Sequence, residues 1–270
     1  MSILIGIVIT GVIPFIGGIV LLLMGKIKAT SFWAGVLAYI ISMVGLVIVS
    51  AILSAVFMDM ILNNSTMFGA ISTLITSIFT ALALAICVGA CLKNQTFNGA
   101  LSCGLGFGVS YAVTSAISFI STYVMAGMIN SGQFDATYSA ALDIGALTKE
   151  QLYEMKTQFI ELTVSDVILQ TAISIAFAAV MVAAAIFIMR GKCSKNLALG
   201  IIAAVMVIAI DGLATIIPSV IAASVVSIAI AAAAVIFAAR MKDQIVQEQS
   251  PVFQDSFLTS IENAKNDQNQ

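Results

Sequence analysis

LALGIIAAVMVIAIDGLATIIPSVIAASVVSIAIAAAAVIFAA, residues 197–239, contains one charged side chain, Asp211, and one proline, Pro218. The run is too long for a single membrane crossing, because about 20 apolar residues already span a hydrocarbon core about 30 Å thick. A proline near its middle, flanked by Thr215 and Ser219, favours a turn between two helices over one bent helix. We therefore predict two crossings here, separated near Pro218.

Polar residues divide the rest of the chain into similar apolar segments. The composition is 61% apolar and 9% charged, with a mean hydropathy of +1.12, whereas a soluble domain is roughly half apolar. The sequence predicts an all-α, polytopic membrane bundle of about seven transmembrane helices over residues 1–242, followed by a polar cytoplasmic tail over residues 243–270. The other five crossings are expected at residues 3–24, 32–62, 68–92, 100–129 and 164–189.

The basic residues predict an orientation. With the N-terminus outside, every short loop that carries a cation falls on the cytoplasmic side, as the positive-inside rule requires. Only Lys149 and Lys156, in the long loop over residues 130–162, break the pattern, and long loops count least. We expect a cytoplasmic C-terminus and a location in the cell membrane. The inside cations are Lys26, Lys28, Lys93, Arg190, Lys192, Lys195, Arg240 and Lys242.

The long loop itself is expected to hold a short amphipathic helix. Thr148 and Gln151 fit a capping box, in which a hydroxyl and an amide three residues on satisfy exposed backbone N–H groups. Behind them, apolar side chains recur at helical spacing, which predicts a helix lying on the outer surface of the membrane or over the mouth of the bundle. Those side chains are Leu152, Met155, Phe159 and Leu162.

Charge and residue usage exclude some classes of function. The net charge is −2, so no basic face indicates a nucleic-acid partner. The chain has no histidine, which removes the commonest metal ligand and general base, and we expect no cofactor. The partners expected are the lipid bilayer and a membrane peptide or membrane protein.

Asp211 is the candidate functional acid. A carboxylate within hydrocarbon costs several kcal/mol unless it is neutral, paired or facing water, so an intramembrane acid indicates function by default. The structural alternative is a protonated carboxyl that hydrogen-bonds a hydroxyl or carbonyl and fixes helix register. Asp59 and Asp166 lie near the outward ends of their segments, where structural roles are favoured.

Glycines and cysteines in the third and fourth segments have two interpretations each. Gly104 and Gly108 lie one turn apart, and such a pair lets a neighbouring helix approach closely. Cys87, Cys91 and Cys103 lie at one depth and are weak candidates for a soft metal ion, although cysteine is also a common small apolar residue in membrane helices. Ser and Thr in both segments are explained by interhelical hydrogen bonds.

Part of the chain resembles the YhfC family of bacterial intramembrane metalloproteases, relatives of the CAAX-type prenyl proteases. The resemblance covers about 130 residues. It rests on TFNGAL (96–101) leading into GLGFG (104–108), and on INSGQFDA (129–136) at a similar spacing. It implies the same bundle in a bacterial plasma membrane.

The residues that the resemblance would make functional are replaced in this chain. Paired glutamates and an arginine would fall near Thr80, Ala81 and Leu84, a histidine at Phe107, and a glutamate at Tyr111. Only Asp211, aligned with a late polar motif, is still acidic. The resemblance therefore implies a pseudoenzyme, a CAAX protease-like scaffold without its zinc site, since zinc needs about three protein ligands.

The leading hypothesis is a non-catalytic membrane protein that binds a membrane peptide, a lipid or a partner protein. A small transporter or channel component that uses Asp211 as a proton or cation site is the first alternative. An active intramembrane protease with the atypical metal ligands Cys87, Cys91, Cys103 and Asp211 is the second.

Overall fold

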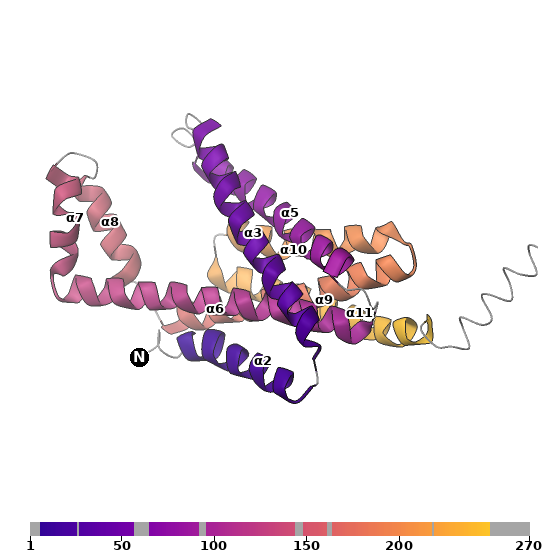
Figure 1. The fold of residues 1–270 in the computed structure, drawn as a ribbon. Helices are drawn as coiled ribbons and strands as arrows, with labels where there is room; N and C mark the ends of the chain where they lie inside the picture. Colours follow the sequence, from indigo (N-terminus) through magenta and orange to yellow (C-terminus); the bar gives the residue numbers. More distant parts are fainter. Residues whose placement is uncertain are drawn as a thin grey trace, which may run out of the picture.

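The computed structural model describes residues 6–25, 27–56, 65–91, 96–143, 148–160, 164–217 and 219–248 (Figure 1). Within these ranges the chain is helical and contains no strand, which confirms the all-α prediction. The elements are η1 (Val8–Val12), α2 (Ile13–Leu23), α3 (Ala29–Val56), α5 (Ser65–Cys91), α6 (Phe97–Asn130), α7 (Gln133–Asp143), α8 (Lys149–Ile160), α9 (Val164–Cys193), α10 (Leu197–Ile216) and α11 (Val220–Glu248).

The helices follow the predicted polar breaks. α10 ends at Ile216 and α11 begins at Val220, on either side of Pro218, which lies outside the described residues together with Asp59, Lys26 and Lys93. Five helices, α3, α5, α6, α9 and α11, are long and apolar enough to cross a membrane. Two further apolar helical segments, Val8–Leu23 and Leu197–Gly212, are shorter than these five. The count of seven crossings and their orientation stay predictions.

The polar stretch between α6 and α9 forms two helices, whereas the sequence predicted one. α8 corresponds to the predicted amphipathic helix, and its Leu152 is buried; the side chains of Met155, Phe159 and Leu162 lie outside the described residues. α7 was not predicted. Its Phe134 is buried, and Asp135 forms an ion pair of 2.5 Å with Lys156 of α8. The two helices stand together at one end of α6 (Figure 1).

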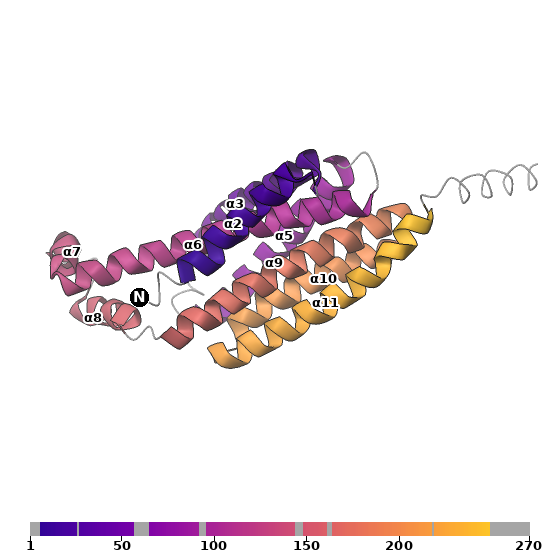
Figure 2. The ribbon, with the colours of Figure 1, turned by 90° about the horizontal axis from the view of Figure 1, so that it is seen from below.

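α9 is the centre of the bundle. It packs against α6, α10 and α11, and Figure 2 shows α9, α10 and α11 running alongside one another. Val180, Met181 and the three alanines of residues 183–185 are fully buried on it. These small side chains let the neighbouring helices approach closely, and dispersion contacts between packed helices stabilise a bundle inside a membrane.

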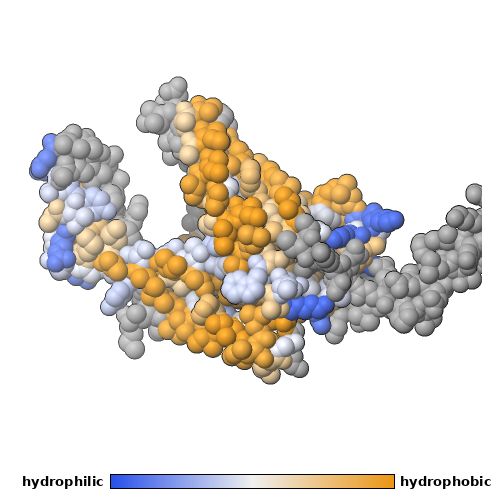
Figure 3. All heavy atoms as spheres, in the orientation of Figure 1, coloured by the Kyte–Doolittle hydropathy of each residue, from blue (hydrophilic) through white to orange (hydrophobic). Residues whose placement is uncertain are grey.

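The outer surface is apolar over most of the helical bundle. Figure 3 shows apolar surface along α3 and along α2, with paler surface between them and the most hydrophilic surface towards the two ends of the molecule. Large side chains such as Val47, Val56 and Ile201 are more than half exposed. Water would not tolerate an apolar surface of this extent on a monomer, whereas a bilayer matches it.

Two of the described cations near the short turns, Lys28 and Lys192, lie at one end of the bundle. Lys28, in the turn between α2 and α3, donates from Nζ to Thr96 Oγ1 at 3.1 Å, at the start of α6. Lys192, near the end of α9, donates from Nζ to the Gly89 carbonyl of α5 at 2.6 Å. α7 and α8 lie at the opposite end of α6 (Figure 2). We call the end that holds Lys28 and Lys192 the cationic end.

α6 makes its closest contacts through glycine. Gly35 of α3 and Gly106 of α6 sit where the two backbones touch: a Cβ on Gly35 would overlap the Cys103 carbonyl, and one on Gly106 would overlap the Phe32 carbonyl. On the other face, a Cβ at Gly104 would lie 2.5 Å from Val182 Cα of α9, and one at Gly108 would lie 3.0 Å from Ala178 Cβ. The glycine-rich run therefore contacts two helices at once. We call these contacts the α6 seam.

Candidate functional site

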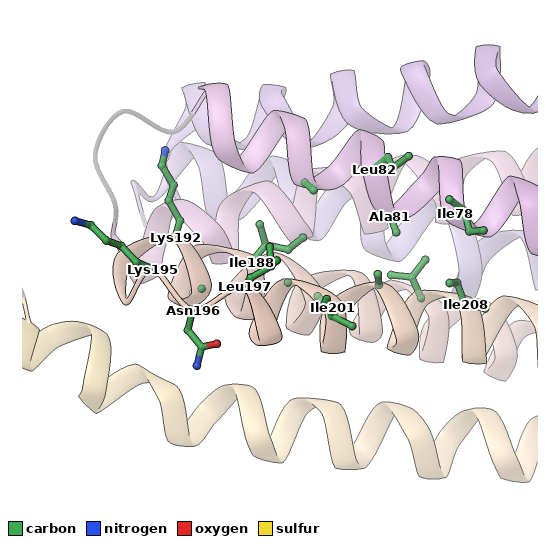
Figure 4. Close-up of a pocket in the computed structure, with 16 residues that line it drawn as sticks. Ile78, Ala81, Leu82, Ile188, Lys192, Lys195, Asn196, Leu197, Ile201 and Ile208 are labelled. Carbon is green, nitrogen blue, oxygen red and sulfur yellow. The ribbon is translucent and has the colours of Figure 1, made fainter.

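A groove of about 570 Å³ lies between α5 and α10, next to the end of α9 (Figure 4). Its floor is made of small or buried side chains: Ala81, Ala203 and Val207. Its rims are large, exposed apolar side chains, among them Leu82 and Ile201. Figure 4 shows α5 side chains pointing towards α10 side chains across the groove. The site is a long apolar furrow that opens to the surface.

Helical spacing creates the groove. On α10, the lining positions include Leu197, Gly200, Ala204 and Ile208, which recur every three or four residues and therefore share one face. Two of the four are small, so the furrow follows from missing side-chain volume. At Gly200, an added Cβ would meet no atom within 4 Å.

Lysines mark the outer end of the groove. Lys192 and Lys195 both line it and lie at the same end in Figure 4. Lys195 lies in the turn after α9 and has a left-handed backbone conformation, with φ of 53°. At the start of α10, Asn196 Oδ1 accepts a hydrogen bond from the Ala198 backbone N–H at 3.0 Å. Lys195 thus stands beside the positive end of the α10 dipole, whereas Lys192 lies in the last turn of α9. From the sequence, these lysines were predicted only to lie on the cytoplasmic side.

Asp211 lies beyond the inner end of the groove. It is on the α10 face that continues from Val207 and Ile208, and Ser77 Oγ of α5 donates to its Oδ2 at 2.6 Å. Ser77 is fully buried, and the Thr73 carbonyl lies 2.7 Å from the same hydroxyl oxygen. The hydroxyl has one hydrogen, so Asp211 and Thr73 compete for it. Asp211 is therefore hydrogen-bonded to α5 from α10. A hydroxyl partner is what the structural alternative for this residue predicted.

A second cavity, of about 260 Å³, lies between α6 and α9. Most of its lining is polar: Tyr111, Ser115, Ser118, Thr122, Gln170 and Ser174. Tyr111 stacks on Phe177 of α9 with 4.1 Å between ring centroids. Tyr111 and Asp211 both stand about 21 Å along their helices from the cationic end, at a rise of 1.5 Å per residue.

The cysteines do not share a site with Asp211. Cys87 and Cys103 are both buried, and the side chain of Cys91 lies outside the described part of the chain. Ser77, which contacts Asp211, is about 15 Å along α5 from Cys87, so one metal ion cannot bind both Cys87 and Asp211. Among the residues that the structure describes, no three Cys, Asp or Glu side chains gather around one point.

Of the positions aligned with the metalloprotease family, only Asp211 carries a zinc donor, and one carboxylate cannot hold the ion. Ala81, Leu84 and Phe107 are all buried within the main apolar core, where their side chains offer only carbon to a metal. Thr80 Oγ1 is occupied by the Ser42 hydroxyl at 2.7 Å. Zinc is bound by thiolate, imidazole or carboxylate, so this residue set does not fit it, and no step through a zinc ion follows.

Comparison of the chain with models of protein families, with curated proteins and with solved structures finds no match.

Proposed function

We propose that the protein is a multi-pass membrane protein that binds an apolar-tailed ligand in the α5–α10 groove without chemically altering it. The observation that carries the proposal is the groove itself: an apolar furrow of about 570 Å³ with a small-residue floor, open along its length and cationic at one end. Ligand sites typically have this volume range and pair an apolar lining with a few polar groups.

The residues of the chain favour binding over catalysis. A protease of the resembled family would need metal ligands and a general base, and the chain has no histidine. The aligned positions Ala81, Leu84 and Phe107 are apolar core residues. The proposal therefore keeps the family resemblance as a shared scaffold and assigns no turnover to it.

Seven crossings with a cytoplasmic cationic end are part of the proposal. Lys28 donates to Thr96 at the start of α6, and Lys192 donates to the Gly89 carbonyl near the end of α5, which supports one common level for these two cations. The positive-inside rule assigns such a level to the cytoplasm, and the bacterial plasma membrane is the location that the resemblance implies.

The test is a variant that fills the groove. Gly200→Leu adds a side chain where a Cβ meets nothing within 4 Å, so it should occupy the furrow without straining the backbone. Native mass spectrometry of the detergent-solubilised protein should show a ligand of lipid or peptide mass on the wild type and a several-fold loss in Gly200→Leu. Gly127→Leu, on an exposed face of α6 with equal free space, is the matched control. Equal occupancy in all three proteins would refute binding in the groove.

Proton or cation transport is the second candidate, because Asp211 is an acidic side chain within an apolar helix. A cavity of about 260 Å³ between α6 and α9, lined mostly by polar side chains, includes Tyr111 at the same level along the bundle as Asp211. Proteoliposomes with a pH-sensitive dye would show proton flux that disappears in Asp211→Asn and persists in Asp166→Asn. Flux equal to that of protein-free vesicles would rule this function out.

A further inference from the structure

We infer that the ligand of the α5–α10 groove is an anionic phospholipid of the leaflet at the cationic end, with one acyl chain in the furrow and its phosphate at Lys195 and Lys192. The inference rests on the proposed function, because it names the ligand of the same groove. Three properties of the described residues lead to it: the length of the furrow, its apolar lining and its charge.

The length of the furrow matches one leaflet. On α10 the lining runs from Leu197, beside the lysines, to Ile208, which is about 16 Å at 1.5 Å per residue. One leaflet of a hydrocarbon core about 30 Å thick is about 15 Å deep. An acyl chain whose headgroup lies at Lys195 therefore ends near Ile208, just short of the Ser77–Asp211 pair.

The apolar lining of the furrow favours a hydrocarbon chain over an extended peptide. An extended peptide would expose backbone N–H and C=O groups to this lining, which costs several kcal/mol for each unsatisfied group. A hydrocarbon chain has no such groups.

The charge of the lining selects the headgroup. Of the described residues that line the groove, two are lysines and none is acidic. Lys195 is exposed at the start of α10, so its ammonium group and the positive end of the helix dipole both favour an anion. Basic pockets between membrane helices on the cytoplasmic side are places where anionic headgroups bind. A zwitterionic headgroup adds a cation that these lysines repel.

The experiment compares lipid headgroups on charge variants. Protein is exchanged into nanodiscs of equal phosphatidylglycerol and phosphatidylcholine with identical acyl chains, then released and examined by native mass spectrometry. Wild-type protein should retain phosphatidylglycerol in preference, and Lys195→Gln should lower that preference about fivefold, the contribution of one lysine at a membrane surface. Lys195→Asn, which tolerates the left-handed backbone, should lower it equally.

The control for general surface charge is Arg240→Gln. Arg240 is exposed on α11 and does not line the groove, so its loss should leave the preference unchanged. Added inorganic phosphate should not displace the lipid, because the acyl chain anchors it. If Lys195→Gln and Arg240→Gln behave alike while Gly200→Leu still removes bound ligand, the headgroup inference is wrong and the groove proposal stands. If Gly200→Leu also retains its lipid, both are wrong.

Discussion

The α6 seam and the α5–α10 groove are made from the same kind of residue and have opposite outcomes. Gly35 and Gly106 lie where two backbones touch, so that even one methyl group would overlap a carbonyl oxygen. Gly200 lies in a furrow where a methyl group would meet nothing. Both regions join apolar helices of similar composition. A small residue in a membrane helix therefore creates either a tight contact or a vacancy, and the neighbouring helix decides which.

The largest expected effect comes from breaking the seam. Gly106→Ala pushes a methyl group into the Phe32 carbonyl, and neither backbone can move without shifting a whole helix. We expect the free energy of unfolding to fall by about 3 kcal/mol, at the upper end of overpacking costs. Thermal unfolding in detergent measures it. Gly127→Ala, elsewhere on α6 with open space around it, should lose nothing, and a loss as large as that of Gly106→Ala would contradict the seam.

The same substitution in the groove should act in the opposite direction. Gly200→Ala replaces the least favourable ordinary helix residue with the most favourable one and meets no neighbour. We expect stabilisation of about 0.5–1 kcal/mol, measured beside Gly106→Ala under identical conditions. A destabilised Gly200→Ala protein would mean that α10 packs more closely at this point than the groove allows.

The hydrogen bond at the inner end of the groove should contribute less. Ser77→Ala and Asp211→Asn, with the double variant, form a cycle that isolates the 2.6 Å contact. We expect a coupling of about 0.6 kcal/mol, the average for polar contacts between membrane helices. Unfolding in a graded detergent mixture measures it. Additive single effects would show that Asp211 does not stabilise the α5–α10 contact.

The ion pair between α7 and α8 should contribute least to the free energy of unfolding. Its removal tests whether α7 and α8 add to the stability of the bundle. Asp135 is 57% exposed, so water screens its interaction with Lys156. Asp135→Asn should change stability by a few tenths of a kcal/mol, which shrinks further at high salt. Circular dichroism at low and high ionic strength measures both. A change in the free energy of unfolding above about 1 kcal/mol would show that α7 and α8 contribute to the stability of the bundle.

The helices could be predicted from the sequence because their signals are local. Apolar runs give α3, α5, α6 and α9, and Pro218 predicts the break between α10 and α11. α7 was missed because its residues, QFDATYSAALD, are mixed in polarity and show no clear apolar stripe. Phe134 and Tyr138, whose ring centroids lie 4.8 Å apart, were the available signal.

The site could be predicted only in part, because it depends on how helices are set against one another. Asp211 stands out in the sequence as a lone charge in an apolar run, but its partner Ser77 is 134 residues away and is one of many hydroxyls. Gly104 and Gly108 were predicted from their spacing to pack against a neighbouring helix. Of the three glycines in this run, however, Gly106 makes the closest approach, and its neighbour is α3. Lys195 looked like an ordinary loop cation. The groove beside it exists only through the register of α5 and α10.

The length of α6 has a consequence for which part of the protein is accessible from outside the membrane. Its 34 residues extend about 51 Å, whereas the hydrocarbon core is about 30 Å thick. In the proposed orientation, with the level of Lys28 at the cytoplasmic face, about 20 Å of the helix extends beyond the hydrocarbon core on the outer side, and α7 and α8 lie on that extension. That orientation predicts that an epitope tag inserted between α7 and α8 is bound by an antibody on intact cells.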